Sequence, residues 1–296
     1  PRGCEDAIIN MLYSLKIDYE IVDNTNHGKL IGVTFKGKER DEQLDAINAL
    51  MPFSNGVLSA TTAFGKTVTA AALIARRKTN TLILVHSKAL LMQWHERLSE
   101  FLDIDFTEDE ISKKRGRKKA FSPVGCLDST SNTLHGVIDI ALMQSCFEND
   151  KVKPFVKGYG MVIVDECHHV SSITFENVLK HVTAHYVYGL TATPIRKDGL
   201  QPIIFMQCGP IRFSADAKAQ IKKQSFQRYL VPRFTSYRPV TDDKQSFTTL
   251  SQSLAESEIR NNLIIEDVLN VVAAGRTPII LTARTSHVEL LAEMLK

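Results

Sequence analysis

The chain has 296 residues, which at roughly 150 residues per domain suggests about two domains. Hydrophobic residues make up 44% of it and charged residues 23%, proportions typical of globular proteins, and these exclude a wholly disordered, collagen-like or coiled-coil chain. The net charge of +3, from 36 Lys and Arg against 33 Asp and Glu, permits nucleic-acid binding without requiring it.

The sequence carries no pattern typical of membrane insertion or secretion. No apolar run approaches the ~18 residues that a membrane span needs, and no basic start is followed by an apolar stretch. The five cysteines are widely spaced and include no C-x-x-C pair, which argues against a disulfide framework or a cysteine zinc site. We therefore expect a cytoplasmic protein with no membrane partner.

The first residues predict a small accessory module. Residues 5–16 have helical periodicity, and residues 17–35 are typical of short strands with a turn at 24–28. We assign 1–37 to an N-terminal α+β module. Its role is open between a nucleic-acid platform and a segment that packs against the rest of the chain.

From about residue 38 onward, short apolar runs alternate with amphipathic helices. This alternation predicts βαβ units and an α/β fold with a parallel sheet buried by helices on both faces. We assign 38–238 to this first large domain. Its expected elements are helix 39–51, strand 57–59, helix 66–77, strand 81–86, helix 88–101, strand 136–142, a weak helix 147–153, strand 160–164, helix 175–182, strand 186–191 and a strand near 226–237.

Two features of this domain have alternative interpretations. The basic run at 113–119, within an interruption at 107–133, is either a solvated loop or a loop that contacts phosphates. Trp94, the only tryptophan, shares a helical face with Leu91 and Leu98, and we interpret it as a core residue rather than a base-stacking one.

A second α/β pattern follows an irregular stretch. The elements we expect are helix 256–273, strand 279–281 and helix 286–295. One strand with two helices is too little for a large sheet, so we interpret 239–296 as a linker and the start of an incomplete second domain.

A phosphate-binding loop is predicted at 60–67, between an apolar strand and a helix. The segment differs from G-x-x-x-x-G-K-[ST] only in its first residue, Ala60. Gly65 lets the backbone approach a phosphate, and N–H groups at the helix start face an anion. Lys66 can reach the β- and γ-phosphates of ATP, and Thr67 can ligate Mg²⁺. The other loop residues expected to bind the nucleotide are Thr62, Ala63 and Phe64.

An acidic pair ends the apolar run at 161–164. Asp165 would complete the Mg²⁺ site together with Thr67, and Glu166 would polarise the attacking water. A parallel strand delivers such groups to the carboxyl edge of its sheet, where ligands of α/β proteins bind. The cysteine and two histidines that follow lack the spacing of zinc ligands. We therefore assign catalysis to Lys66, Asp165 and Glu166.

Two further segments, DECH at 165–168 and GLTATP at 189–194, resemble motifs of the superfamily 2 helicases. The first is similar to their DEAD/DEAH-type box and the second to their motif III. The sequence of 189–199 is similar to the corresponding segment in the XPB-like branch and in the type I and III restriction subunits. The resemblance implies a RecA-like fold for 38–238 and the start of a second RecA-like domain within 239–296.

Other segments resemble motifs of the same family, in the family's order. The resemblance implies that Arg40 stacks on adenine and that Gln43 hydrogen-bonds its edge. It implies that His168, Thr191 and Thr193 couple the nucleotide site to nucleic-acid contacts. It assigns contacts with the nucleic-acid backbone to Ser87, Lys88, Gln144 and Ser145.

As a whole, the resemblance implies an ATP-dependent helicase or translocase that uses ATP and Mg²⁺ and acts on nucleic acid, with DNA favoured over RNA. A nuclease or other subunits and a prokaryotic or phage-like setting follow from the restriction branch. No Q-x-x-G-R-x-x-R-like motif follows residue 284, so the family's arginine finger has no counterpart and we expect weak hydrolysis. The alternatives are a non-catalytic nucleic-acid sensor or scaffold with a vestigial ATP site, and an unrelated P-loop enzyme such as a small-molecule kinase.

Overall fold

The computed structural model describes residues 1–105, 122–149, 151–168, 173–193, 199, 201–215, 229–238 and 247–296. The chain divides into a first unit, residues 1–225, and a second unit, residues 226–296. The assignment of three parts, with boundaries at 37 and 238, stays a prediction. The basic run at 113–119 lies outside the described residues.

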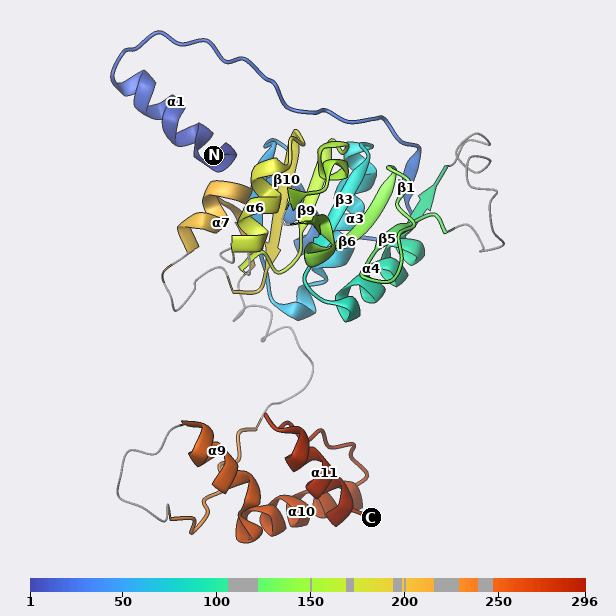
Figure 1. The fold of residues 1–296 in the computed structure, drawn as a ribbon, viewed down its shortest axis with the longest axis vertical. Coiled ribbons are helices and arrows are strands. Elements are labelled where there is room, and N and C mark those ends of the chain that lie inside the picture. The colour runs from blue at the N-terminus through green and yellow to red at the C-terminus, as the bar shows by residue number, and fades with distance from the viewer. Residues whose placement is uncertain are drawn as a thin grey trace. The chain divides into compact units, whose positions relative to one another are not determined.

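A parallel sheet of seven strands forms the centre of the first unit (Figure 1). Its spatial order is β11-β2-β10-β9-β3-β6-β5, and neighbouring strands pair in parallel. The predicted α/β class is thereby confirmed. The strands are β2 (Asn55–Ser59), β3 (Thr81–Val85), β5 (Gly125–Leu127), β6 (Ile138–Leu142), β9 (Met161–Val164), β10 (Tyr186–Thr191) and β11 (Ile211–Ser214).

Alternate residues of the strands pack against two different layers of helices. In β3, Ile83 and Val85 belong to one apolar cluster, whereas Leu82 and Leu84 belong to the other. Successive side chains of a strand point to opposite faces, so a strand covered on both faces is apolar throughout. One layer contains α2 (Asp41–Leu50), α3 (Lys66–Arg77) and α4 (Lys88–Phe101), and the other contains α6 (Ile173–His181) and α7 (Gln201–Cys208).

The N-terminal part of the first unit has less regular structure than expected. It begins with η1 (Arg2–Cys4) and α1 (Glu5–Ser14), and β1 (Val33–Phe35) pairs antiparallel with β4 (Leu102–Ile104). Residues 17–25 form no strand, so the predicted short strands were wrong over this stretch. Apolar residues there, such as Val22, are exposed, because no neighbouring strand covers them.

The described residues of 147–153 include two short paired strands in place of the predicted helix. Here β7 (Phe147–Glu148) pairs antiparallel with β8 (Lys151–Val152). The turn begins at Asn149, whose φ of 48° lies in the left-handed region that a right-handed helix excludes. Three short 3₁₀ helices connect the larger elements, η2 (Thr62–Phe64), η3 (Met143–Cys146) and η4 (Pro154–Lys157).

The second unit is helical in its described part. It consists of α9 (Phe247–Glu256), α10 (Glu258–Ala273) and α11 (Thr285–Met294). The predicted strands near 226–237 and at 279–281 were wrong where the structure describes them, because no partner strand pairs with these segments there. Across the described ranges, no helix is long and apolar enough to cross a membrane.

Candidate active site

The carboxyl ends of five parallel strands meet at one edge of the sheet. Thr191 at the end of β10 pairs with Ser59 at the end of β2, and Val85 at the end of β3 pairs with Leu142 at the end of β6. Val164 at the end of β9 lies between β10 and β3. The loops that carry the predicted motifs therefore lie side by side, at the edge where α/β proteins bind ligands.

The loop 60–65 connects β2 to α3 and is shaped to approach an anion closely. Gly65 has a φ of 84°, and a Cβ atom there would lie 2.7 Å from Nε2 of Gln43, so both its backbone and its surroundings require glycine. Ala60 is not among the residues with positive φ, so this first loop position does not need the glycine of the motif. The N-cap of α3 is Gly65, which has no side chain to cap the helix, and N–H groups at a helix start suit an anion.

Lys66 opens α3 and bridges the loop to the acidic pair. Its side chain is only 7% exposed, and its ammonium group donates a hydrogen bond to the carbonyl of Ala60 over 3.1 Å. The same ammonium lies 3.6 Å from Oε1 of Glu166. Thr67, the next residue of α3, is half-buried beside it. A cation and a hydroxyl group thus stand at the helix start, as phosphate and Mg²⁺ binding require.

The carboxylate of Asp165 is buried and held in one orientation. Its Oδ1 accepts a hydrogen bond from the backbone N–H of Glu166 over 3.0 Å, and its Oδ2 accepts one from the indole N–H of Trp94 over 2.7 Å. Burial raises the pKa of Asp165, and the hydrogen bond from Trp94 opposes this shift. Glu166 has a φ of 46°, an uncommon backbone conformation for a non-glycine residue that turns the chain sharply after β9.

His168 connects this acidic pair to β10. Its Nδ1 lies 3.0 Å from Oγ1 of Thr191 and 3.2 Å from Oε2 of Glu166. The hydroxyl oxygen of Thr191 also accepts a hydrogen bond from the backbone N–H of Thr193 over 3.1 Å. Polar contacts therefore run without a break from Lys66 to motif III.

Arg40 and Gln43 hold the phosphate-binding loop from the side of α2. The Arg40 guanidinium donates to the carbonyls of Phe64 and, over 3.4 Å, of Ala63. The Gln43 side chain is buried and donates to the Phe64 carbonyl over 3.0 Å, while its oxygen accepts from the Arg40 N–H. Thr62 and Ala63 are exposed on the loop. Contacts of Arg40 and Gln43 with adenine stay a prediction.

Ser87 and Lys88, two of the predicted nucleic-acid contacts, lie where β3 leads into α4. The Ser87 side chain caps α4 by accepting a hydrogen bond from the N–H of Leu90 over 3.3 Å. The Lys88 ammonium lies 3.0 Å from Oδ2 of Asp128. Hydrogen bonds, chiefly from the N–H of Thr130 and from Lys88, hold the pKa of Asp128 well below its usual range.

Gln144 and Ser145, the other two, lie on η3, directly after β6. The Gln144 side chain is exposed and donates to the carbonyl of His86 over 3.4 Å, which joins the loop after β6 to the loop after β3. Ser145 is half-buried. The predicted site residues thus form two neighbouring groups, one after β2, β9 and β10 and one after β3 and β6.

Trp94 is a functional candidate that sequence reasoning missed. It is buried on the same face of α4 as Leu91 and Leu98, which confirms its prediction as a core residue. Its hydrogen bond to Asp165, however, joins residues 71 positions apart. Helical spacing indicates which face is buried, but no local signal indicates such a partner.

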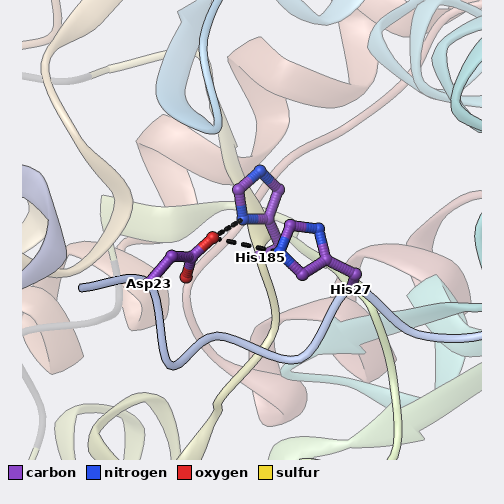
Figure 2. A group of neighbouring side chains, drawn as sticks. All are labelled: Asp23, His27 and His185. Carbon is purple, nitrogen blue, oxygen red and sulfur yellow. Dashed lines mark hydrogen bonds and ion pairs between the residues drawn. The ribbon is translucent and has the colours of Figure 1, made fainter. Parts of the chain in front are cut away.

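A second group of side chains able to ligate metals lies at the amino end of β10, away from this edge. Figure 2 shows Asp23, His27 and His185 pointing toward one another. Oδ2 of Asp23 lies 3.0 Å from Nε2 of His27 and 3.4 Å from Nδ1 of His185. The imidazole rings are stacked, with centroids 4.1 Å and planes 24° apart. A shared ion would lie in both ring planes at ~2.0–2.1 Å from each nitrogen, whereas stacked rings direct their lone pairs side by side. We therefore assign the cluster to hydrogen bonding between the N-terminal segment and the sheet.

Comparisons with known proteins agree with this geometry. The family described as Type III restriction enzyme, res subunit, matches residues 36–196. Putative helicase 161L of Invertebrate iridescent virus 6 is 28% identical over 275 residues, which cover 90% of this chain and 57% of that protein. The DNA 3'-5' translocase XPB2 of Sulfurisphaera tokodaii is 28% identical over 172 residues, which cover 58% of this chain and 34% of that protein.

The fold has a solved counterpart. The crystal structure of the UvsW helicase from bacteriophage T4 has a TM-score of 0.51 at 14% sequence identity, over 73% of this chain and 79% of that one. This likeness supports the RecA-like fold. The chain spans 57% and 34% of the two relatives named above, so it corresponds to part of their length.

Proposed function

The chain belongs to the family of the Type III restriction enzyme res subunit, within the superfamily 2 helicases, and on this premise we propose that it is an ATP-dependent nucleic-acid motor. One observation carries the proposal, the connected polar group that runs from Lys66 through Glu166 to Thr191. Its members come from distant segments that the parallel sheet brings to one edge. A chance G-K-T sequence would not lie against an acidic pair and a threonine hydroxyl.

We propose that ATP binds with its phosphates against the loop 60–65 and the first turn of α3. The residues there fit a magnesium nucleotide, because Gly65 allows close approach and Thr67 and Asp165 offer the oxygen ligands that Mg²⁺ prefers. When bound, Mg²⁺ would neutralise charge that develops on the phosphates. Lys66 would add its positive charge to that of the ion.

Glu166 is the residue that we propose as general base. Its carboxylate would accept a proton from the attacking water. One of its oxygens lies near Lys66 and the other near His168, so movement of Lys66 toward a phosphate would free the first oxygen. His168 lies against the second oxygen and would transmit the state of the nucleotide site to Thr191.

The nucleic-acid backbone is proposed to pass the ends of β3 and β6. Hydroxyl, amide and ammonium contacts to phosphates position a strand without reading its sequence. We favour DNA, because the XPB2 relative is named as a DNA translocase, and we propose a nuclease or other subunits as partners, because the family is that of a restriction enzyme subunit. The contacts would be made by Ser87, Lys88, Gln144 and Ser145.

The test is Mg²⁺-dependent ATP binding and hydrolysis, measured alone and with single-stranded DNA, duplex DNA or RNA. We expect ATP binding and weak hydrolysis that one of the polymers stimulates. Lys66→Ala should abolish ATP binding and reduce turnover about 100-fold or more, because it removes a charge that the phosphates require. Lys180→Ala is the matched control, since this exposed lysine of α6 forms a surface ion pair with Glu176, and it should leave both unchanged.

Each outcome separates the interpretations. ATP binding that Lys66→Ala removes, without turnover, would support the nucleotide site and favour the sensor or scaffold alternative or a motor that needs a further arginine. Strong stimulated turnover would contradict the expectation of weak hydrolysis. Absence of both binding and turnover would contradict the proposed function.

A further inference from the structure

The single tryptophan of the chain is hydrogen-bonded to a residue of the candidate active site. Trp94 is 1% exposed, and its indole N–H donates to Oδ2 of Asp165 over 2.7 Å. The other carboxylate oxygen accepts from the Glu166 N–H, and the Asp165 N–H donates to the carbonyl of Leu84 in β3. Asp165 is therefore fixed through its main chain by the sheet and through its side chain by α4.

The helix that carries Trp94 begins at the other group of site residues. Ser87 caps α4, and Lys88 is its first residue. From Lys88 to Trp94 the helix rises ~9 Å, less than two turns. Leu91 and Leu98, on the same buried face, are 2% and 0% exposed, so packing on both sides of Trp94 fixes this part of α4 against the sheet. A displacement at the start of α4 would therefore be carried to the indole ring.

We propose that Trp94 is a positioning residue, which holds the Asp165 carboxylate in the orientation that receives Mg²⁺ and ties it to the helix whose first residues face the nucleic acid. This inference rests on the proposed function, because it takes Asp165 as a ligand of the magnesium nucleotide. Trp94 acts through Asp165 and touches neither substrate nor nucleotide.

The indole N–H matters because the carboxylate is buried. A hydrogen bond to an ionised acceptor is roughly twice as strong as one between neutral groups, and a buried acceptor that loses its donor keeps the cost of desolvation. Without this donor, the Asp165 carboxylate could rotate among several orientations, and only one of them suits Mg²⁺. The free energy at stake corresponds to about a 10-fold weakening of Mg²⁺-dependent binding.

The first measurement uses the fluorescence of Trp94, which no other tryptophan obscures. We expect the emission to change when a non-hydrolysable ATP analogue is added with Mg²⁺, and to change much less when EDTA replaces Mg²⁺. Lys66→Ala should abolish the change. Duplex or single-stranded DNA should alter the same emission, because α4 connects Lys88 to Trp94.

The second measurement removes the donor while the ring shape is kept. A chain with one tryptophan can be labelled at that position alone with β-(3-benzothienyl)alanine, in which sulfur replaces the N–H group. We expect the Mg²⁺ concentration that half-saturates mant-ATP binding to rise about 10-fold, with little change in the melting temperature. Trp94→Phe should act in the same direction. Leu179→Val, a core change in α6 on the other face of the sheet, is the matched control and should leave the Mg²⁺ dependence unchanged.

The two hypotheses fail in different ways. If mant-ATP does not bind at any Mg²⁺ concentration, both the proposed function and the inference are contradicted. If it binds with Mg²⁺, but the emission of Trp94 does not respond and the benzothienyl protein has the Mg²⁺ dependence of the unlabelled one within twofold, the proposed function stands and the role of Trp94 is overturned. The benzothienyl protein decides the question even where Trp94→Phe does not fold.

Discussion

The contacts that stabilise each unit internally differ between the two units of the chain. In the first unit, strands such as β3 bury apolar side chains on both faces, and all five of its residues are fully buried. In the described part of the second unit, the buried side chains are few, and half of them are polar. They are Ala255, Asn261, His287 and Leu291.

Hydrogen bonds connect the three helices in the described part of the second unit. Nε2 of His287 on α11 lies 3.0 Å from Oδ1 of Asn261 on α10, and the Asn261 amide donates to the carbonyl of Ala255 on α9 over 2.8 Å. Oγ1 of Thr282 lies 2.8 Å from Nδ1 of His287. A buried network of this kind specifies one arrangement only while each member keeps its partners and its charge state.

Similar apolar runs adopt different secondary structure in the two units. Leu82, Ile83 and Leu84 form a central strand, because β9 and β6 pair with it on either side. The similar run at 279–281 forms no strand, and Leu281 is 90% exposed. An apolar run therefore becomes a buried strand only where neighbouring strands and covering helices exist.

The largest expected effect tests the apolar core of the first unit. Ile83→Ala should lower the free energy of unfolding by about 2–5 kcal/mol, because it leaves a cavity between two packed layers. Urea unfolding followed by Trp94 fluorescence measures this unit alone. Ile8→Ala on α1, where the side chain is 47% exposed, is the control and should stay within about 0.5 kcal/mol of the wild type. A loss below about 1 kcal/mol for Ile83→Ala would contradict a close-packed core.

A smaller effect tests the polar network of the second unit. Burial, and to a smaller extent the positive charge of Arg260, lowers the pKa of His287 below its usual 6.5. The unfolded unit then binds more protons, so this stability is complete above pH 6.5 and is lost as the pH falls through the lowered pKa. Hydrogen exchange, corrected for intrinsic rates, should show 247–296 opening more readily at about pH 5.5 than at about pH 7.5, with β3 unaffected. Equal behaviour of the two regions would argue against the network.

Asn261→Ala sharpens the same test at constant pH. It removes the partner of Nε2 on the buried His287 ring and the amide that donates to the Ala255 carbonyl, and it should cost the second unit about 1–3 kcal/mol in local exchange. Asn262→Ala, at the exposed neighbouring position of α10, should cost about 0.5 kcal/mol or less. If both variants behave alike, the hydrogen bonds of Asn261 do not stabilise the unit.

The smallest effect concerns the exposed run. Leu281→Ala should change the free energy of unfolding by less than about 0.5 kcal/mol, because the side chain is already in water. The melting temperature of the helical signal should therefore change little. Far-UV circular dichroism checks this. A loss of more than about 1.5 kcal/mol would mean that another part of the protein covers Leu281.

Much of the fold follows from periodicity, because long amphipathic helices and apolar strands signal themselves locally. The helices at 66–77 and 88–101 have the bounds that the sequence predicts. The errors fall on short or isolated segments. A left-handed Asn149 turns a weak helix into a hairpin, and the run at 279–281 has no partner strand in the described structure.

The candidate site divides in the same way between local and long-range information. Motif spacing alone identifies Gly65, Lys66 and the acidic pair, because a phosphate-binding loop and a strand-end carboxylate are local structures. The roles of Arg40 and Gln43 depend on what they contact, and in the structure their side chains bind the carbonyls of the loop.

The sequence by itself determined the class of fold, the parallel direction of the strands and the residues able to bind phosphate and Mg²⁺. Each of these depends on a repeating or contiguous pattern. Only the tertiary structure decided that Trp94 donates to Asp165 and that Asp23 meets His185 across the unit. Such contacts depend on which strands become neighbours and how a helix is rotated on the sheet. Those choices are made by the packing of the whole core, which no local segment encodes.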